Sequence, residues 1–424
     1  MVAICEHPGP VTPSEDMTPW TSRFVDRVRD PVQEFLATES AGGIALAGAA
    51  LVAIVWATVA TASYAAFWAH SLPSWIGGLS AHLTLQDLAR EGLMPIFFFV
   101  VGLEVKRELT VGELSDMRVA RLPVIAALGG MVVPALIYAA VVHGGPGAGG
   151  WGIPMATDIA FVVGALQLLG TRVPTQLKVF MLAIAVVDDI GAIIVIAVWY
   201  SHGVRAGWIL ASVACVVAAW LVLRAGVRWV PLFVVLGIAS CLAMAAGGVS
   251  PTIDAVVLGL MMPMAPWRVP SGAQTTAPGP TAVERLEHLI HPWSAFVVLP
   301  LFALASAGIP LTAEAIRHAA TDPIALGVVF GLVIGKPVGV LTATWLAVTL
   351  RLGVLPDGLR WSHVACGAAL AGIGFTVAIF IATLAFPQTA QADVALIGIL
   401  AGSMIAALLG LGIALVTGRR DVGV

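Results

Sequence analysis

Long runs of apolar residues, separated by short polar segments, follow one another along most of the chain. A helix that crosses a bilayer needs roughly 20 such residues, and a helix satisfies its own backbone hydrogen bonds in lipid. The pattern therefore predicts an all-α polytopic membrane protein with twelve transmembrane helices. Their approximate ranges are 42–62, 90–107, 121–142, 151–170, 175–200, 206–226, 229–247, 251–264, 291–307, 322–348, 362–386 and 392–417. The seventh and eighth are the hardest to divide, because only Gly247-Gly248 and Pro251 separate them.

The basic residues predict how these helices are oriented, since cytoplasmic loops carry the excess of Lys and Arg. With the N-terminus in the cytoplasm, seventeen of the 21 Lys and Arg residues fall on the cytoplasmic side. Arg90, Arg205 and Arg317 fall outside, and Lys336 lies within the membrane. Both termini are therefore predicted to be cytoplasmic, which requires an even number of spans.

Composition supports the membrane assignment and excludes several function classes. Of the 424 residues, 59% are hydrophobic and 11% are charged, whereas an ordinary soluble domain is about 25% charged. The net charge of −3 and the absence of a basic tract argue against nucleic acid as a partner. The four cysteines lack metal-binding spacing, and we expect no cofactor. No HExxH or GxSxG motif is present, so we do not expect an enzyme.

The two ends of the chain differ from the apolar region between them. Residues 1–37 and 418–424 are predicted to be cytoplasmic tails, and residues 38–417 a twelve-helix transporter domain. The first 19 residues lack the apolar run of a signal peptide. Residues 20–36 alternate apolar and basic positions, which suits either a helix lying on the membrane surface or a loose amphipathic linker.

Three carboxylates lie inside apolar runs. Asp158 follows Thr157 shortly after Pro154, and Asp188-Asp189 sit in the middle of the run 175–200. No residue within seven positions of the Asp pair carries a compensating positive charge. Because an ionisable residue in a membrane is costly, it indicates a functional site. These residues therefore predict a site near the middle of the bilayer.

A second unusual region lies near the C-terminus. Lys336 is thirteen residues after Pro323 and fifteen before Arg351, and Gly372 and Gly374 loosen the next span. Helices 3–5 and 10–12 thus form two triplets of opposite orientation, with interrupted helices 4 and 11. Inverted repeats with interrupted helices are typical of transporters whose site lies near the bilayer midplane. Asp158 would then balance the positive N-terminal ends of the half-helices and Lys336 the negative C-terminal ends.

Two loops have open interpretations. Gly77-Gly78 lies between the first two helices and suits a hairpin turn, so this loop is either an external partner contact or a plain loop. Further along, Glu284, His288 and His291 share one helix face. That face is either solvated or, together with Glu287, responsive to pH near neutrality.

Seven runs of the sequence are distinctive as wholes. They are FFFVVGLEVKREL (97–109), PVIAALGGMVVPALIY (123–138), GWGIPMATDIAFVVGAL (150–166), AVVDDIGAIIVIA (185–197), HPWSAFVVLPLFALASAG (291–308), GLVIGKPVG (331–339) and GIGFTVAIFIATLAF (372–386). With these runs, nearly all of residues 38–417 resembles the NhaA-type sodium/proton antiporters.

The resemblance implies a pH-regulated exchanger of sodium or lithium for protons, in the bacterial inner membrane. It implies a core of 121–200 and 322–417 and an interface region of 42–107 and 206–307 that includes a homodimer contact. The implied site residues are Asp188, Asp189, Thr157, Asp158 and Lys336, with Glu104, Glu284, Glu287 and His288 near a cytoplasmic funnel. Ser250 stands where family members often carry a histidine that is linked to pH response. Asp254 is an unassigned intramembrane carboxylate, for which a helix-start role is the favoured interpretation.

Within that site, neighbouring helical residues point about 100° apart, so Asp188 and Asp189 cannot both face one cavity equally. We expect Asp189 to bind sodium from an aqueous funnel, since carboxylate oxygens suit hard cations, and Asp188 to pair with Lys336. Transport would be electrogenic and would proceed by alternating access. A sodium/solute symporter would need a larger pocket for an organic substrate, and a channel would need a symmetric filter ring.

Overall fold

The computed structural model describes residues 41–72, 83–201, 203–225, 230–264, 281–387 and 389–418. Within these ranges every regular element is a helix, and the β contacts are limited to one antiparallel bridge between Ser71 and Thr84. The N-terminal tail with its candidate surface helix, the Gly77-Gly78 turn and the tail 419–424 lie outside the described residues.

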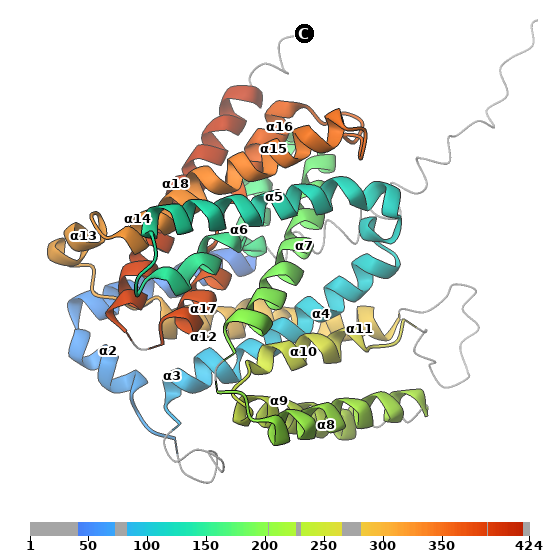
Figure 1. The fold of residues 1–424 in the computed structure, drawn as a ribbon, viewed down its shortest axis with the longest axis vertical. Coiled ribbons are helices and arrows are strands. Elements are labelled where there is room, and N and C mark those ends of the chain that lie inside the picture. Colours follow the sequence, from blue (N-terminus) through green and yellow to red (C-terminus); the bar gives the residue numbers. More distant parts are fainter. Residues whose placement is uncertain are drawn as a thin grey trace, which may run out of the picture.

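The helices follow one another along the chain with short connections (Figure 1). They are Ala41–Val59, α2 (Thr61–Trp68), α3 (Leu85–Asp87), η1 (Leu88–Gly92), α4 (Met94–Thr110), η2 (Glu113–Ser115), α5 (Met117–Val142), η3 (Ala148–Met155), α6 (Ile159–Leu168), η4 (Gly170–Arg172), α7 (Thr175–Trp199), α8 (Ala206–Arg224), α9 (Val230–Ala246), α10 (Pro251–Leu260), α11 (Ala282–Trp293), η5 (Ser294–Val298), α12 (Leu299–Ser306), α13 (Ala313–Ala319), α14 (Pro323–Phe330), η6 (Gly331–Gly335), α15 (Lys336–Thr349), α16 (Trp361–Leu370), α17 (Phe375–Ala385) and α18 (Ala390–Gly418).

The helical content confirms an all-α membrane protein but not the full number of spans. In the described ranges, eight helical segments are long and apolar enough to cross a membrane, and nine if the bent pair α16–α17 is one span. The other three predicted spans correspond to shorter helices, α4 with 17 residues, α9 with 17 and α10 with 10. Twelve spans and the inverted repeat therefore stay predictions.

The predicted spans 151–170 and 362–386 are both interrupted near their middle. The first consists of the 3-10 helix η3, an extended stretch at Ala156–Asp158 and helix α6. The second bends by 44° between α16 and α17. Both breaks agree with the sequence-based expectation for helices 4 and 11.

Three spans contain a π-helical turn that the sequence pattern did not predict. In the described part of the chain these turns are η1, η5 and η6. Each precedes a helix with proline at its second position (Pro95, Pro300 and Pro337), directly for η5 and η6 and with Leu93 between for η1. Proline lacks an N–H and its ring clashes with the carbonyl four residues earlier. A wider π turn avoids that clash, and such turns are frequent at functional sites.

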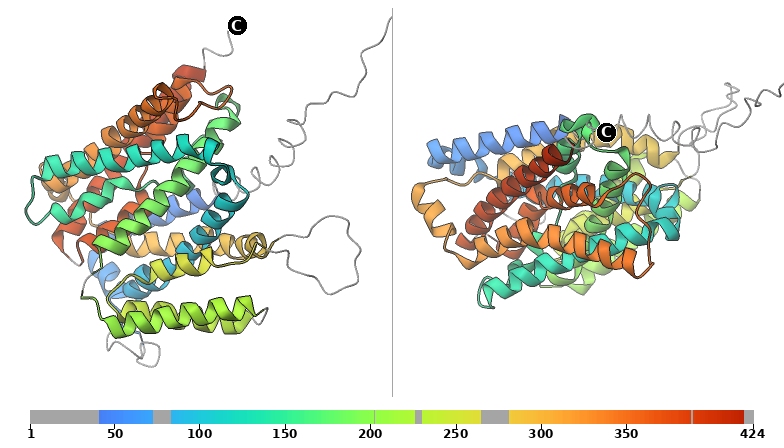
Figure 2. Two further views of the ribbon diagram at one scale, coloured as in Figure 1. Left: turned by 45° about the vertical axis from the view of Figure 1, so that its right-hand side comes forward. Right: turned by 90° about the horizontal axis from the view of Figure 1, so that it is seen from above.

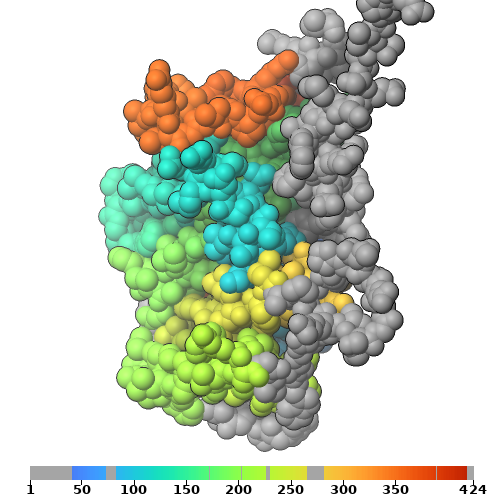
Figure 3. Space-filling view, turned by 90° about the vertical axis from the view of Figure 1, so that its right-hand side faces the viewer, coloured from blue at the N-terminus to red at the C-terminus, as the bar shows by residue number. Residues whose placement is uncertain are grey.

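The helices are arranged in successive layers (Figures 1 and 2). Helices α8 and α9 lie side by side at one edge, α10 comes next, and α4 and α11 follow. The space-filling view shows the same order from the yellow-green edge to the cyan region of α4 and on to the orange segment around α15 and α16 (Figure 3). In the layer after α4 and α11, helices α6, α7 and α17 cross one another, in a region called the crossing below (Figure 1). On its other side, α5 packs along α15, and α18 packs against α14 and α16.

Candidate ion site at the crossing of two broken helices

Asp158 connects the two interrupted spans, at the break before α6 and the break between α16 and α17. Its Oδ1 accepts a hydrogen bond from the N–H of Phe161 at the start of α6 (3.3 Å). Its Oδ2 accepts bonds from the N–H (2.9 Å) and the hydroxyl (2.5 Å) of Thr376 at the start of α17. A helix N-terminus carries unpaired N–H groups and partial positive charge. One carboxylate therefore caps two half-helices, which is the balancing role expected for Asp158.

The backbone completes this junction. The N–H of Asp158 donates to the carbonyl of Ile373 (2.7 Å) in the break between α16 and α17. The hydroxyl of Thr157 lies 3.0 Å from the carbonyl oxygen of Ala371 in the same break. The two interruptions thus satisfy each other's backbone groups in a region that lipid could not solvate.

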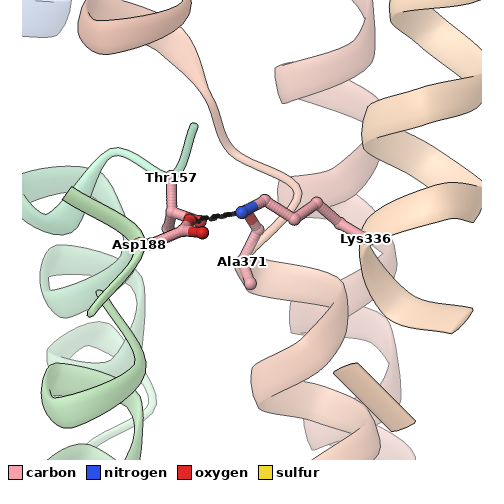
Figure 4. Close-up of polar contacts among 4 residues, drawn as sticks. All are labelled: Thr157, Asp188, Lys336 and Ala371. Carbon is pink, nitrogen blue, oxygen red and sulfur yellow. Dashed lines mark hydrogen bonds and ion pairs between the residues drawn. The ribbon is translucent and has the colours of Figure 1, made fainter. Parts of the chain in front are cut away.

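Asp188, on α7, forms the charged centre of the site (Figure 4). Its Oδ2 accepts a hydrogen bond from Thr157 (2.6 Å) and forms an ion pair with the ammonium group of Lys336 at the start of α15. Both side chains of the pair are 1% exposed. A buried ion pair costs desolvation energy that only good geometry and further hydrogen bonds offset. The second oxygen, Oδ1, is buried and has no hydrogen-bond partner in the described structure.

Asp189 lies on a different face of α7, as the helical angle requires. It lines a cleft together with Thr157 and Asp158, whereas Asp188 does not. It is 4% exposed and makes no ion pair with any described residue. Asp158 and Glu104 line the same cleft, and Asp188 is the preceding residue on α7. The site therefore gathers several carboxylates beside Lys336, a set of oxygen ligands that suits a cation.

The cleft is small. Its volume is about 30 Å³, which holds about two water molecules. Its walls come from α4, the crossing, α11, η5, α12 and α17. The polar side chains among its lining are Glu104, Thr157, Asp158, Asp189, His291, Ser294 and Thr376. A site of this size suits a small ion and does not suit an organic solute.

The four residues expected near a pH-sensitive funnel lie in four different environments. Glu104 is buried and lines the cleft. Glu287 is buried and forms an ion pair with Arg107, which joins α11 to α4. Glu284 instead caps the start of α11, where its carboxylate accepts the N–H of Thr281 (2.7 Å). His288 is exposed.

The structure also brings two residues to the cleft that the sequence did not assign to the ion site. His291, expected only on a pH-responsive face with Glu284 and His288, is buried and lines the cleft, so the inward face of α11 carries Glu287 and His291 rather than His288. The spacing of four between these two residues was a usable signal. Thr376, which holds Asp158, gave none, because a threonine at the start of a helix is common.

Glu108, just beyond the predicted span 90–107, is a further buried carboxylate at the end of α4. Its Oε2 accepts the N–H of Glu113 (3.1 Å) in the following turn. Burial raises the pKa of this carboxyl above its usual value, although Arg107 and the bond from Glu113 partly oppose that rise. The turn between α4 and η2 is therefore a pH-sensitive contact.

Comparison with known proteins gives a consistent result. The family described as Na+/H+ antiporter 1 matches residues 33–414. The Na(+)/H(+) antiporter NhaA of Rhodopirellula baltica is 41% identical over 434 residues, covering 95% of this chain and 98% of that protein. The Na(+)/H(+) antiporter NhaA 2 of Myxococcus xanthus is 43% identical, covering 92% and 89%. The NhaA of Nocardia farcinica is 42% identical, covering 93% of each chain.

Proposed function

The chain belongs to the Na+/H+ antiporter 1 family, and from that membership we propose that it exports sodium, or lithium, in exchange for protons through the site around Asp188 and Asp189. As a member of this family it is a membrane transporter and not an enzyme. The observation that carries the proposal is the unpaired Asp189 in a small cleft beside the Asp188–Lys336 ion pair.

Sodium and protons compete for the same oxygens in this mechanism. Asp189 faces the cleft and supplies the first carboxylate oxygen to an arriving sodium ion. Asp188 Oδ1, which lacks a hydrogen-bond partner, and the Thr157 hydroxyl supply further oxygens, the ligand type that hard cations prefer. Protonation of the carboxylates removes the charge that holds the ion. Either species neutralises the site, so release of one permits binding of the other.

Lys336 accounts for a second proton. When sodium takes Asp188 as a ligand, the ammonium group of Lys336 loses its partner in a buried environment, where an unpaired charge is strongly disfavoured. Lys336 then releases a proton, and it regains one when Asp188 is free again. One sodium ion therefore exchanges for more than one proton, and the cycle moves net charge.

Access alternates between the two sides of the membrane by movement of a core against an interface region. The core comprises 121–200 and 322–417, with the triplets 3–5 and 10–12 as inverted repeats. The interface region comprises 42–107 and 206–307. Both termini face the cytoplasm of a bacterial cell, in its inner membrane.

Two chains form a homodimer through the external hairpin between the first two helices. The hairpin is supported by the antiparallel bridge of Ser71 with Thr84, while its turn lies outside the described residues. The pH response arises at the cytoplasmic end of α4 and α11, from Glu104, Glu284, Glu287 and His288. The burial of Glu104 and Glu287 supports this assignment.

Purified protein in proteoliposomes with an imposed pH gradient tests the function. Adding sodium should collapse the gradient with saturable, pH-competitive kinetics. Asp189→Asn should abolish this exchange at every pH while the protein stays folded, because the amide cannot bind sodium and release a proton in turn. Asp357→Asn, a change of the same kind at an exposed loop position, is the control and should exchange normally. Near-normal exchange by Asp189→Asn would remove Asp189 from the mechanism.

A further inference from the structure

A fourth intramembrane aspartate, Asp254, has no part in the mechanism above. It lies in the first turn of α10 and is 3% exposed. This is the helix-start position that the sequence suggested, but the carboxylate makes no capping bond to α10. Instead Oδ2 faces two other helices, where it accepts hydrogen bonds from Ser212 of α8 (2.8 Å) and from Ser240 of α9. The aspartate therefore links three helices.

The two serines complete a closed polar cluster. Both are 0% exposed, and their hydroxyl oxygens lie 3.1 Å apart. Ser240 is also within hydrogen-bond distance of the backbone carbonyl of Ser212 (3.1 Å). No lysine, arginine or histidine among the described residues forms an ion pair with Asp254; the thiol of Cys241 is the titratable group near it. Hydrogen bonds to hydroxyl groups, and not a counter-charge, hold this carboxylate.

The helix that these bonds reach is otherwise loosely attached. In α8 only Ser212 and Ala219 are buried, while large apolar side chains such as Leu210 and Val217 are exposed. Helices α8 and α9 form a pair at the edge of the molecule (Figure 1). Lipid is as apolar as leucine, so burial of apolar side chains supplies no hydrophobic force between helices in a membrane, and polar contacts count for more. In the described structure the cluster thus supplies side-chain hydrogen bonds that link α8 to both α9 and α10.

The opposite face of α10 supports the ion site. Its backbone packs directly on α4, where a Cβ added at Gly102 would lie 2.6 Å from the carbonyl oxygen of Val256, and one added at Gly259 equally close to that of Phe99. Helix α4 in turn supplies Val101 and Glu104 to the cleft. A displacement of α10 therefore moves one wall of the cleft, because two helix backbones in contact cannot shift independently.

We propose that Ser212, Ser240 and Asp254 form an intramembrane clasp that fixes the α8–α9 pair to α10, and that Asp254 thereby positions α4 at the cleft. Asp254 is a positioning residue, since it acts on the cleft through α10 and α4. The clasp works through hydrogen-bond acceptance and not through charge. The effect on sodium binding rests on the proposed function, whereas the attachment of α8 does not.

Three variants, assayed for sodium transport in proteoliposomes, test how the clasp acts on the cleft. Asp254→Leu replaces the carboxylate with a somewhat larger apolar group and removes the acceptor that both serine hydroxyls share. It should raise the KM for sodium about three- to tenfold, the range expected for lost interhelical hydrogen bonds in a membrane. Asp254→Asn keeps an acceptor oxygen without the charge and should stay within about twofold of the parent KM. Ser240→Ala, a milder change that preserves insertion, should fall between them.

Thr252→Val is the matched control. Thr252 is equally buried on the same helix, but its hydroxyl contacts only Ser250 (2.7 Å) in the described structure, so its KM should not change. A KM unchanged in both Asp254→Leu and Ser240→Ala, or an Asp254→Asn variant as impaired as Asp254→Leu, would overturn the proposal.

Hydrogen–deuterium exchange supplies a readout that does not depend on transport. The amides of α8 should exchange faster in Asp254→Leu than in the parent and the Thr252→Val control. Unchanged exchange in α8 would refute the clasp even if sodium transport is impaired. Faster exchange in a protein that transports no sodium would support the clasp and refute the proposed function alone.

Discussion

At the scale of single residues, the site depends on one carboxylate that serves two helices. Asp158 receives N–H donors from the first turns of both α6 and α17. The hydroxyl of Thr376 adds a side-chain donor to these backbone contacts. It is therefore the contact that a substitution can remove without altering the backbone.

Thr376→Val tests that contact. The variant keeps the shape of the side chain but removes a hydrogen bond to a buried carboxylate, which is worth about 1.5 kcal/mol or more. We expect thermal unfolding in detergent to show a lower melting temperature, and sodium-driven exchange to be slower. Thr383→Val on the same helix is the control, since that hydroxyl bonds only the carbonyl of Phe380 (2.7 Å). Equal behaviour of the two variants would show that the Thr376 hydroxyl is dispensable.

The sequence pointed to the charged residues of the candidate site and to Thr157, but not to Thr376. Asp188, Asp189 and Lys336 stand out because each interrupts an apolar run. Thr376 does not, since threonine occurs throughout membrane helices. The sequence also did not show which helices the side chain of Asp254 faces. Its partners are two ordinary serines, and the apolar pattern does not determine how their helices are rotated relative to α10.

At the scale of elements, the π turns divide spans that appear uniform in the sequence. The run 322–348 reads as one apolar helix, yet the π turn η6 sits directly before Lys336 and Pro337. A π turn holds one residue more than an α-helical turn, which shifts the spacing of the residues on each helix face. In a helix that is apolar on every face, that shift leaves no trace in the pattern of apolar residues. The proline that follows each π turn was the available signal for it. The approximate position of an apolar span was predictable, because its length must match the thickness of the bilayer.

Pro337→Ala tests whether the π turn positions Lys336. The new N–H can donate to the carbonyl of Val333 in the regular pattern, which removes the extra residue and rotates the two halves of the helix by up to about 100°. Lys336 would then lose its alignment with Asp188, and we expect exchange to fall at least about tenfold. Pro123→Ala, a buried proline of α5 with no π turn before it, should retain exchange. Full activity of Pro337→Ala would show that the turn is incidental.

The turn after α4 gives a prediction about pH. Because burial raises the pKa of Glu108, the folded protein holds this proton more tightly than the unfolded chain. Its contribution to stability is fully present at low pH and is lost as pH rises through the folded-state pKa. Glu108→Gln, which stays neutral, should therefore raise the melting temperature at alkaline pH and leave it unchanged at acidic pH. Parallel melting curves of the two proteins across pH would contradict this.

At the scale of the whole molecule, the coupling of two carboxylates and a lysine predicts that transport carries charge. One carboxylate would suffice if a single proton exchanged for each sodium ion, whereas Asp188, Asp189 and Lys336 meet in one buried site. A charge crossing 100 mV gains about 2.3 kcal/mol, more than a tenfold sodium gradient is worth. An inside-negative cell could then expel sodium without an acidic exterior.

Proteoliposomes clamped at zero and at an imposed potential, with ion gradients held fixed, measure this directly. Exchange should generate current and should accelerate when the potential favours net proton entry. Electroneutral exchange that ignores the potential would reduce Lys336 to a structural partner of Asp188.

The small volume of the cleft has a consequence for how the protein distinguishes cations. A space that holds about two water molecules cannot admit an ion with its full hydration shell. An ion bound there would keep about two water molecules at most, so the cost of removing the rest of its hydration shell is set against the carboxylate and hydroxyl oxygens that replace it. Discrimination between sodium and potassium would then be a matter of dehydration, and the temperature dependence of transport would be steeper for the ion that fits less well.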